Sequence, residues 1–345
     1  PMRAWQTVRA GRPREALELA ATLPPPEPRA GTLRVDVLAA GIGLPDALMC
    51  HGGYALTPPL PFTQGQEVVG RVDTPGPGVE GRRRGDRVMA VTSFFTGDGA
   101  FAEQCLALDD FCLPVPEEMT DAEAAGFLIP LHTAWIGLVR RGRLEPGETL
   151  LVLGGSGGTG SAAIQLGRAL GARVVAAAGG PEKADFCRQL GADEVVDPRV
   201  EDLAASVRAL TDGRGAQVVY DPVGGDAFRS ATRCVAHEGR ILMVGFASGA
   251  WGRVEPPHLV SQNYSVVGVI PTGYDRASKE EAQERLVALW REGRIRIPID
   301  ARVPFEALPD ALERLERRGV RGKLVLAVDP AATAPEGTRS EPTSR

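Results

Sequence analysis

The chain has 345 residues, of which 43% are hydrophobic and 24% charged, and its formal net charge is −5. This length suggests about two domains, and an acidic balance without a basic block argues against a nucleic-acid partner. There is no apolar run of about 18 residues, which argues against a membrane partner, and five scattered cysteines suggest free thiols in the cytoplasm.

The first 120 residues contain short strand-like segments that Gly and Pro separate. Apolar residues alternate or cluster over 2–5, 31–40, 64–72 and 85–91, and turn-forming sequences lie between these runs. Such a succession of short strands predicts an irregular β-barrel.

The pattern changes near residue 120, where Thr120 and Glu123 form a capping box that predicts the start of a helix. From residue 149 onward, strand-like and helix-like segments alternate. The expected strands are 149–153, 173–178, 194–196, 217–220, 240–245 and 265–270, and the expected helices are 181–190, 203–210 and 226–235. This alternation predicts a parallel sheet covered by helices on both faces. A long helix over 279–292 and a last strand over 323–328 are expected to complete the first domain.

The stretch from residue 149 to 170 carries the clearest motif in the chain. A run of β-prone residues leads into five glycines within seven residues, and a helical segment of small residues follows. Gly155, Gly157 and Gly160 fit G-x-G-x-x-G in the strand–turn–helix context that gives this motif its meaning. The loop is therefore expected to bind the pyrophosphate of a dinucleotide at a helix N-terminus. Its expected contact residues are Gly155, Ser156, Gly157, Gly158, Thr159 and Gly160.

Further short motifs occur in order along nearly the whole chain, from residue 2 to about 328. They include residues 40–41, 45–46, 53–54, 65–70, 85–88, 99–103, 129–135, 191–193, 220–225, 245–249 and 322–323. Together with the glycine loop, they resemble the medium-chain dehydrogenase/reductase superfamily, and within it the zinc-free quinone oxidoreductases of the zeta-crystallin group.

The resemblance implies an α/β protein with a GroES-like β-barrel catalytic domain and a Rossmann domain whose parallel sheet is doubly wound. It places the first part of the catalytic domain at 2–122 and the NADP-binding Rossmann domain at 123–270. Residues 271–329 are then expected to complete the catalytic domain, and 330–345 to form a disordered tail.

A metal is not expected. Zinc-dependent members of the superfamily carry Cys in the place of Gly43 and His in the place of Gln66. Glycine has no donor atom, and an amide is a poor zinc ligand. Without a Lewis acid, the expected substrates are those that accept hydride readily, namely quinones and carbonyl-conjugated alkenes.

The expected cofactor is NADPH. An NAD site usually has an acidic residue about 20 residues beyond the first glycine, but here residues 176–180 are all Ala or Gly. Lys183 and Arg199 match basic residues that hold the 2′-phosphate in quinone oxidoreductases, although either could instead be a solvent-facing charge. On the family pattern, the other cofactor-binding residues are Gly245, Phe246, Ala247 and Lys323.

Tyr54 matches a Gly-x-Tyr position of the family and is expected to donate a hydrogen bond to the substrate carbonyl. A packing aromatic is the alternative for this residue. Thr133 matches the family threonine that helps to place the nicotinamide, and it completes the expected catalytic pair. The expected substrate pocket contains Gly43, Asp46, Gln66 and His132, the last as a further candidate acid.

These features predict a zinc-independent NADPH-dependent reductase of a small-molecule quinone or activated alkene. Two alternatives stay open: a trans-acting reductase of polyketide or fatty-acyl enoyl thioesters, and a non-catalytic NADPH-binding protein of the crystallin type. Residues 264–269 form an apolar edge strand, and an uncovered strand of that kind tends to pair with another chain. Because family members commonly join their Rossmann sheets there, we expect a homodimer.

Overall fold

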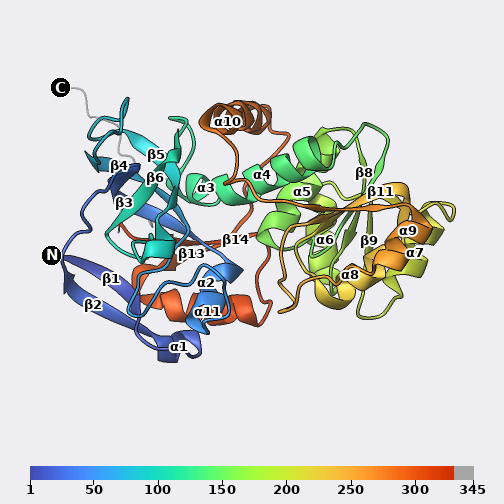
Figure 1. Ribbon diagram of the computed structural model, residues 1–345, viewed down its shortest axis with the longest axis horizontal. Coiled ribbons are helices and arrows are strands. Elements are labelled where there is room, and N and C mark those ends of the chain that lie inside the picture. Colours follow the sequence, from blue (N-terminus) through green and yellow to red (C-terminus); the bar gives the residue numbers. More distant parts are fainter. Residues whose placement is uncertain (330–345) are drawn as a thin grey trace, which may run out of the picture. The chain divides into compact units, whose positions relative to one another are not determined.

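The computed structural model describes residues 1–329, which form two compact units (Figure 1). The barrel unit comprises residues 1–125, 301–316 and 324–329, and the Rossmann unit comprises residues 126–300 and 317–323. The first boundary lies close to the predicted one at residue 122. The tail predicted over 330–345 lies outside the described residues.

The barrel unit is built on a sheet whose strands close on themselves. The strand order is β13-β14-β3-β4-β5-β6, and β3 also pairs with β6, so that β3 to β6 form a ring. Within β3, Leu33 and Val35 are buried while Asp36 is exposed, as the alternation in the sequence predicts. The strands are β3 (Thr32–Ile42), β4 (Glu67–Pro75), β5 (Arg87–Thr92), β6 (Gln104–Pro114), β13 (Ile299–Pro304) and β14 (Lys323–Ala327).

Shorter elements surround this barrel. Strands β1 (Met2–Thr7) and β2 (Leu17–Leu23) form an antiparallel ribbon, of which β2 was not predicted. Helix α3 begins at the predicted capping box, where the Glu123 N–H donates to Thr120 Oγ1 at 3.2 Å and the Thr120 N–H donates to Glu123 Oε2 at 3.0 Å. The helices are α1 (Pro13–Ala16), α2 (Leu44–Cys50), α3 (Asp121–Ala125) and α11 (Leu308–Glu316), with 3-10 turns η1 (Phe94–Thr96) and η3 (Phe305–Ala307).

The Rossmann unit contains a six-stranded sheet in the order β12-β11-β10-β7-β8-β9. All five strand pairings are parallel. The chain starts at β7, runs outward to β9 and returns to the other side of β7 at β10, so the switch point lies between β7 and β10, where sheets of this kind bind ligands. The strands are β7 (Thr149–Val152), β8 (Arg173–Ala177), β9 (Glu194–Val196), β10 (Ala216–Asp221), β11 (Val235–Met243) and β12 (Ser265–Gly268).

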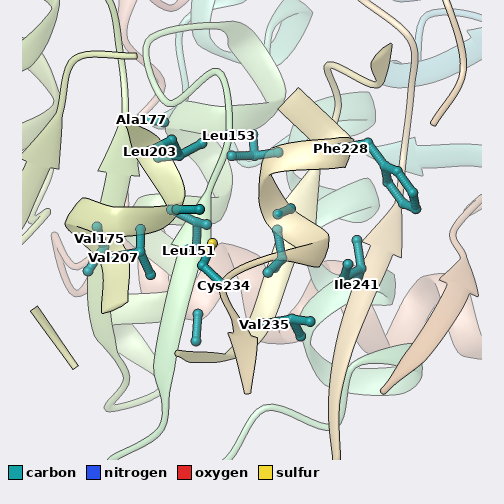
Figure 2. Packing of buried hydrophobic residues seen from close by; sticks show 14 of the residues in the cluster. Leu151, Leu153, Val175, Ala177, Leu203, Val207, Phe228, Cys234, Val235 and Ile241 are labelled. Atoms are coloured by element: carbon teal, nitrogen blue, oxygen red, sulfur yellow. The ribbon is translucent and has the colours of Figure 1, made fainter. Parts of the chain in front are cut away.

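Helices cover both faces of this sheet. On one face, Leu203 and Val207 of α7 and Phe228 of α8 join strand residues in a buried apolar cluster (Figure 2). On the other face α5 packs closely, because Gly167 allows the helix to approach Leu150 of β7. The helices are α4 (Leu128–Trp135), the π-helix η2 (Ile136–Arg141), α5 (Gly158–Ala169), α6 (Pro181–Gln189), α7 (Leu203–Leu210), α8 (Gly225–Thr232), α9 (Pro256–Gln262) and α10 (Arg276–Arg291).

The two compact units divide residues 271–329 differently from the predicted domains. Residues up to 300, including α10, belong to the Rossmann unit. Gln283 on α10 is buried, and its Oε1 lies 2.8 Å from Nε2 of His132 on α4. This packing against α4 fixes α10 to the Rossmann unit, and the return to the barrel begins only at residue 301.

Candidate functional site

The glycine loop joins β7 to α5 in the predicted way. Gly154 has φ +59°, a conformation that favours glycine, and a Cβ at Gly160 would lie 2.1 Å from the Gly154 carbonyl oxygen. Helix α5 starts at Gly158, and its N-cap residue Gly157 has no side chain to cap it. The first N–H groups of α5 therefore lack intrahelical acceptors and carry partial positive charge. The loop thus offers a backbone site that fits a phosphate group.

Lys323 lies beside this helix end. The Gly322 N–H donates to the Ser156 carbonyl oxygen at 2.8 Å, which ties the segment before β14 to the glycine loop. Lys323 is only 8% exposed, and its Cδ lies 2.9 Å from where a Cβ at Gly158 would stand. A buried cation and the positive end of α5 are thus held together, and an anion bound there is favoured by both.

Lys183 and Arg199 meet at the carboxyl end of β8. Arg199 Nη2 lies 3.0 Å from where a Cβ at Gly180 would stand, and the same nitrogen pairs with Asp197 at 2.9 Å. Hydrogen bonding within this pair raises the pKa of Arg199 and holds the pKa of Asp197 well below its usual range. Lys183 Nζ donates to the Arg318 carbonyl oxygen at 2.7 Å.

Arg318 is a third cation of this cluster that sequence reasoning missed. The pKa of Lys183 is lowered, first by burial and then by the positive charges of Arg318 and Arg199. Arg318 lies far from Lys183 in the sequence, and its only signal was its closeness to the family motif at 322–323. Three cations in one cluster suit a bound phosphate.

The loops after β7, β10 and β11 adjoin at the carboxyl edge of the sheet. In the predicted segment 245–247, the Ala247 N–H donates to the Pro222 carbonyl oxygen at 3.0 Å. Val223 Cγ2 lies 3.0 Å from where a Cβ at Gly154 would stand, so the turn after β10 touches the glycine loop. This edge is where ligands bind in open parallel sheets.

Two residues beyond the predicted set shape this edge. Asp221 is fully buried, and its Oδ1 accepts hydrogen bonds from the Val223 and Gly224 N–H groups, each at 2.8 Å. Burial raises the pKa of Asp221, and these hydrogen bonds oppose the rise. Trp251 is 54% exposed and its ring packs at a tilt against that of Phe246, with the centroids 4.6 Å apart. Asp221 therefore fixes the turn after β10, and Trp251 supports the ring of Phe246.

Helix α4 carries both Thr133 and His132. Thr133 is 7% exposed, and among the described residues its hydroxyl makes no hydrogen bond. His132 is 1% exposed and bonds to Gln283, and burial lowers its pKa to about 4. The expected role of His132 in the substrate pocket stays a prediction. The position of His132 joins α4 to α10.

The barrel unit holds Tyr54 just after α2. Its ring centroid lies 6.5 Å from that of Phe94, and the side chain is partly buried. Burial raises the pKa of the Tyr54 phenol, the nearby Gln66 side chain lowers it, and the charge of Asp46 raises it. The structure thus brings Tyr54, Gln66 and Asp46 together within this unit, as a pocket would require.

Asp46 has a structural contact that the sequence reasoning did not foresee. Its Oδ2 accepts a hydrogen bond from the Gly43 N–H at 2.8 Å and so closes the start of α2. Asp46 is 1% exposed, so the protein covers nearly all of its side chain, and its expected place in the substrate pocket stays a prediction. Gly43 itself has φ −122°, an extended conformation that any residue can adopt.

The donor set in the barrel does not fit zinc. Gly43 has no donor atom, and Gln66 offers an amide where a zinc site needs imidazole or thiolate. In residues 1–329 there is no group of three or more His, Cys, Asp and Glu side chains that could hold a metal ion. None of the helices in that same part of the chain combines the length and apolar character needed to cross a bilayer.

A barrel unit joined to a Rossmann unit with a glycine loop defines a nucleotide-dependent oxidoreductase of the medium-chain type. Two family models match in that order: the alcohol dehydrogenase GroES-like domain over residues 29–117 and the zinc-binding dehydrogenase over residues 158–319. Among solved structures, quinone oxidoreductase of Escherichia coli complexed with NADPH has a TM-score of 0.86 at 28% identity, covering 94% of this chain and 99% of that one. A mycobacterial protein complexed with NADPH has a TM-score of 0.87 at 30% identity, with coverages of 95% and 100%.

Curated relatives define the family more closely. Quinone oxidoreductase-like protein 2 of Bos taurus is 35% identical over 300 residues, which cover 86% of this chain and 85% of the relative. Quinone oxidoreductase of Homo sapiens is 28% identical over 329 residues, covering 94% and 97%. The chain belongs to the quinone oxidoreductase-like family of the medium-chain dehydrogenase/reductase superfamily, and it is an oxidoreductase of that superfamily.

Proposed function

We propose that this protein is a zinc-independent, NADPH-dependent reductase that delivers hydride to a quinone or to a carbonyl-activated alkene. The observation that carries the proposal is the cation cluster of Lys183, Arg199 and Arg318 at the carboxyl end of β8. An NAD-binding sheet normally has an acidic residue at the end of its second strand. Here Gly179 and Gly180 leave room in that place, and Arg199 lies over them.

Each part of the cofactor has residues that suit it. The first N–H groups of α5, with Lys323 beside them, would hold the pyrophosphate. Lys183, Arg199 and Arg318 would hold the 2′-phosphate. Thr133 and the segment 245–247 would hold the nicotinamide, which NADPH when bound supplies as the hydride donor.

Tyr54 is proposed as the proton donor. Its phenol keeps its proton at neutral pH because burial raises the pKa above the ordinary value. The Tyr54 O–H can then donate a hydrogen bond to a substrate carbonyl oxygen as negative charge develops there. Because the barrel lacks zinc ligands at 43 and 66, the substrate must be one that accepts hydride without a Lewis acid.

A substrate panel tests the reaction. NADPH oxidation is followed with 1,2-naphthoquinone, 9,10-phenanthrenequinone, 2-alkenals and crotonyl-CoA. Turnover of the quinones or alkenals supports the proposal, whereas turnover of crotonyl-CoA alone makes the protein an enoyl-thioester reductase. Tight NADPH binding without any turnover favours a non-catalytic protein, and stoichiometric zinc in elemental analysis refutes zinc independence.

We also propose a cytoplasmic homodimer that forms through the edge strand β12. The five cysteines are all buried free thiols, as suits a reducing compartment. β12 is the terminal strand of the Rossmann sheet, and Ile270 just beyond it is 62% exposed. An open apolar edge of this kind favours pairing with a second copy. Size-exclusion chromatography with light scattering tests this, and a monomer at micromolar concentration refutes it.

A further inference from the structure

Two segments near Tyr54 contain no charged residue at all. They are residues 52–66, which run from the end of α2 to β4, and residues 88–97, which run from β5 through η1. Residues 62–65 and 88–94 of these segments are buried, so their uncharged surface comes from residues 52–57, 59–61 and 95–97. Their composition suits contact with an apolar partner rather than with water.

The two segments lie side by side. The Thr63 N–H donates to the Gly97 carbonyl oxygen at 3.0 Å, and Phe62 packs under Gly97, where a Cβ would lie 3.2 Å from the Phe62 Cβ. The ring of Phe94 lies 6.5 Å from that of Tyr54 and 5.6 Å from that of Phe95. Aromatic contacts therefore lead from the proposed proton donor outward to Phe95.

Apolar side chains on these loops face water although the loops are firmly anchored. Leu56, Leu60 and Phe95 are 50%, 48% and 42% exposed, whereas Phe62 is buried. The Thr57 hydroxyl donates to the Tyr54 carbonyl oxygen at 2.6 Å, which holds the turn in place. Around these three residues, Ala55, Pro59 and Pro61 are also exposed. We call this set of six residues the apolar rim. Exposed apolar side chains that gather in one region are a feature of binding surfaces.

We infer that the apolar rim binds the alkyl chain of a substrate whose carbonyl oxygen is held by Tyr54. This inference rests on the proposed function, and it narrows the substrates to quinones or enones that carry an apolar chain. The alkyl chain of the substrate is chosen as the occupant because the apolar rim begins next to Tyr54. The Phe94 ring contacts both Tyr54 and Phe95 and so connects the proposed proton donor to the rim. A lipid surface is disfavoured because neither loop supplies Lys or Arg to meet anionic headgroups.

A chain-length series tests the rim. In wild type, kcat/KM for 2-alkyl-1,4-benzoquinones with two to eight side-chain carbons should rise about twofold per methylene, half of the roughly fourfold gain that complete burial of a CH₂ gives. Leu60→Ser and Phe95→Ser should flatten this rise while leaving the shortest quinone unchanged. The matched control is Leu19→Ser on β2, because Leu19 is 38% exposed and belongs to the same unit. A flat series in wild type, or equal slopes in wild type and both rim variants, overturns the inference.

A binding series separates this inference from the proposed reaction. N-alkylacetamides carry a carbonyl and an alkyl chain but cannot accept hydride, and their Kd is measured by ligand-observed NMR. One outcome is that no quinone or alkenal turns over, while the Kd for N-alkylacetamides falls with chain length in wild type but not in Leu60→Ser. The proposed function then fails, and the inference about the apolar rim holds. If turnover is normal and neither series depends on the rim, the rim fails alone. Loss of a dimer in Leu60→Ser, by light scattering, would make the rim a contact between copies and also overturn the inference.

Discussion

Gly157, the N-cap of α5, and Gly160, in its first turn, are expected to respond differently when each is changed to Ala. A Cβ at Gly160 would lie 2.1 Å from the Gly154 carbonyl oxygen and 2.9 Å from the Gly155 Cα, and both are backbone atoms that cannot rotate away. Since ordinary contact begins at 3.4 Å, α5 must move to admit the methyl group. Overpacking of this kind costs about 1–3 kcal/mol. At about 2–4 °C per kcal/mol, Gly160→Ala should lower the melting temperature by roughly 2–12 °C.

Gly157→Ala is expected to spare the fold. Its Cβ would lie 3.5 Å from the Gly154 carbonyl oxygen, an ordinary contact, and φ −77° suits any residue. The loss of unfolding free energy should stay below about 1 kcal/mol, because Gly is only moderately better than Ala at an N-cap. The added methyl group stands where the proposal places the pyrophosphate, however, so NADPH binding should weaken.

Thermal melts with and without NADPH separate these effects. NADPH at 100 times its Kd stabilises wild type by about 2.7 kcal/mol, and a hundredfold weaker variant gains only about 0.4 kcal/mol at the same concentration. Gly273→Ala, in the loop after β12, is the matched control, because no atom lies within 4 Å of its added Cβ. If Gly160→Ala melts like this control, the close packing of α5 is refuted. If Gly157→Ala keeps the full rise with NADPH, the loop does not hold the pyrophosphate.

Three further predictions concern single side chains. Lys183→Ala should raise the KM for NADPH about 10- to 100-fold and leave the KM for NADH nearly unchanged, since a charged hydrogen bond contributes about 1.5–3 kcal/mol. Steady-state kinetics with both cofactors check this, and an equal rise in both KM values refutes it. Tyr54→Phe should lower kcat about 10²- to 10⁴-fold without changing the Kd for NADPH, as stopped-flow rates and a fluorescence titration can show. For His132 the folded pKa is lowered to about 4, so below about pH 6.5 only the unfolded state gains its proton. The free energy of unfolding should therefore fall by up to about 3 kcal/mol between pH 6.5 and pH 4, and urea titrations of His132→Gln should lack that part of the decrease.

Local patterns predicted the elements that depend on local physics. Helix α7 spans Leu203–Leu210 as its periodicity indicates, because one face packs on the sheet. Helix α3 starts at its capping box because Thr120 and Glu123 satisfy each other's N–H groups. Helix α9 escaped prediction because none of its residues is buried, so no apolar face marks it in the sequence. The ribbon strand β2 pairs only with β1 and likewise has little apolar periodicity.

The sequence predicted the part of the candidate site that lies within one short segment. It did not predict the contacts between segments that are far apart in the sequence. The glycine loop is complete within a few residues, and its close contacts follow from the motif itself. Arg318 reaches Lys183 across 135 residues, and α10 joins the Rossmann unit through a hydrogen bond between His132 and Gln283, 151 residues apart. Contacts of that range depend on how whole elements pack, and no spacing in the sequence encodes them.

Lys183 and Arg199 should contribute unequally to the choice between NADPH and NADH. Arg199 already pairs with Asp197, so a phosphate at that position has to compete with a carboxylate, and the net gain is the difference between two exposed ion pairs. Lys183 instead lies near the positive charges of Arg318 and Arg199, and burial and those charges lower its pKa. A 2′-phosphate relieves this repulsion and favours the charged lysine, whereas NADH brings no charge that could do so. The proposed preference for NADPH therefore arises from cations that lie close together in the folded protein. Relief of the repulsion at Lys183 should contribute more to the free energy of NADPH binding than the ion pair of Arg199 does.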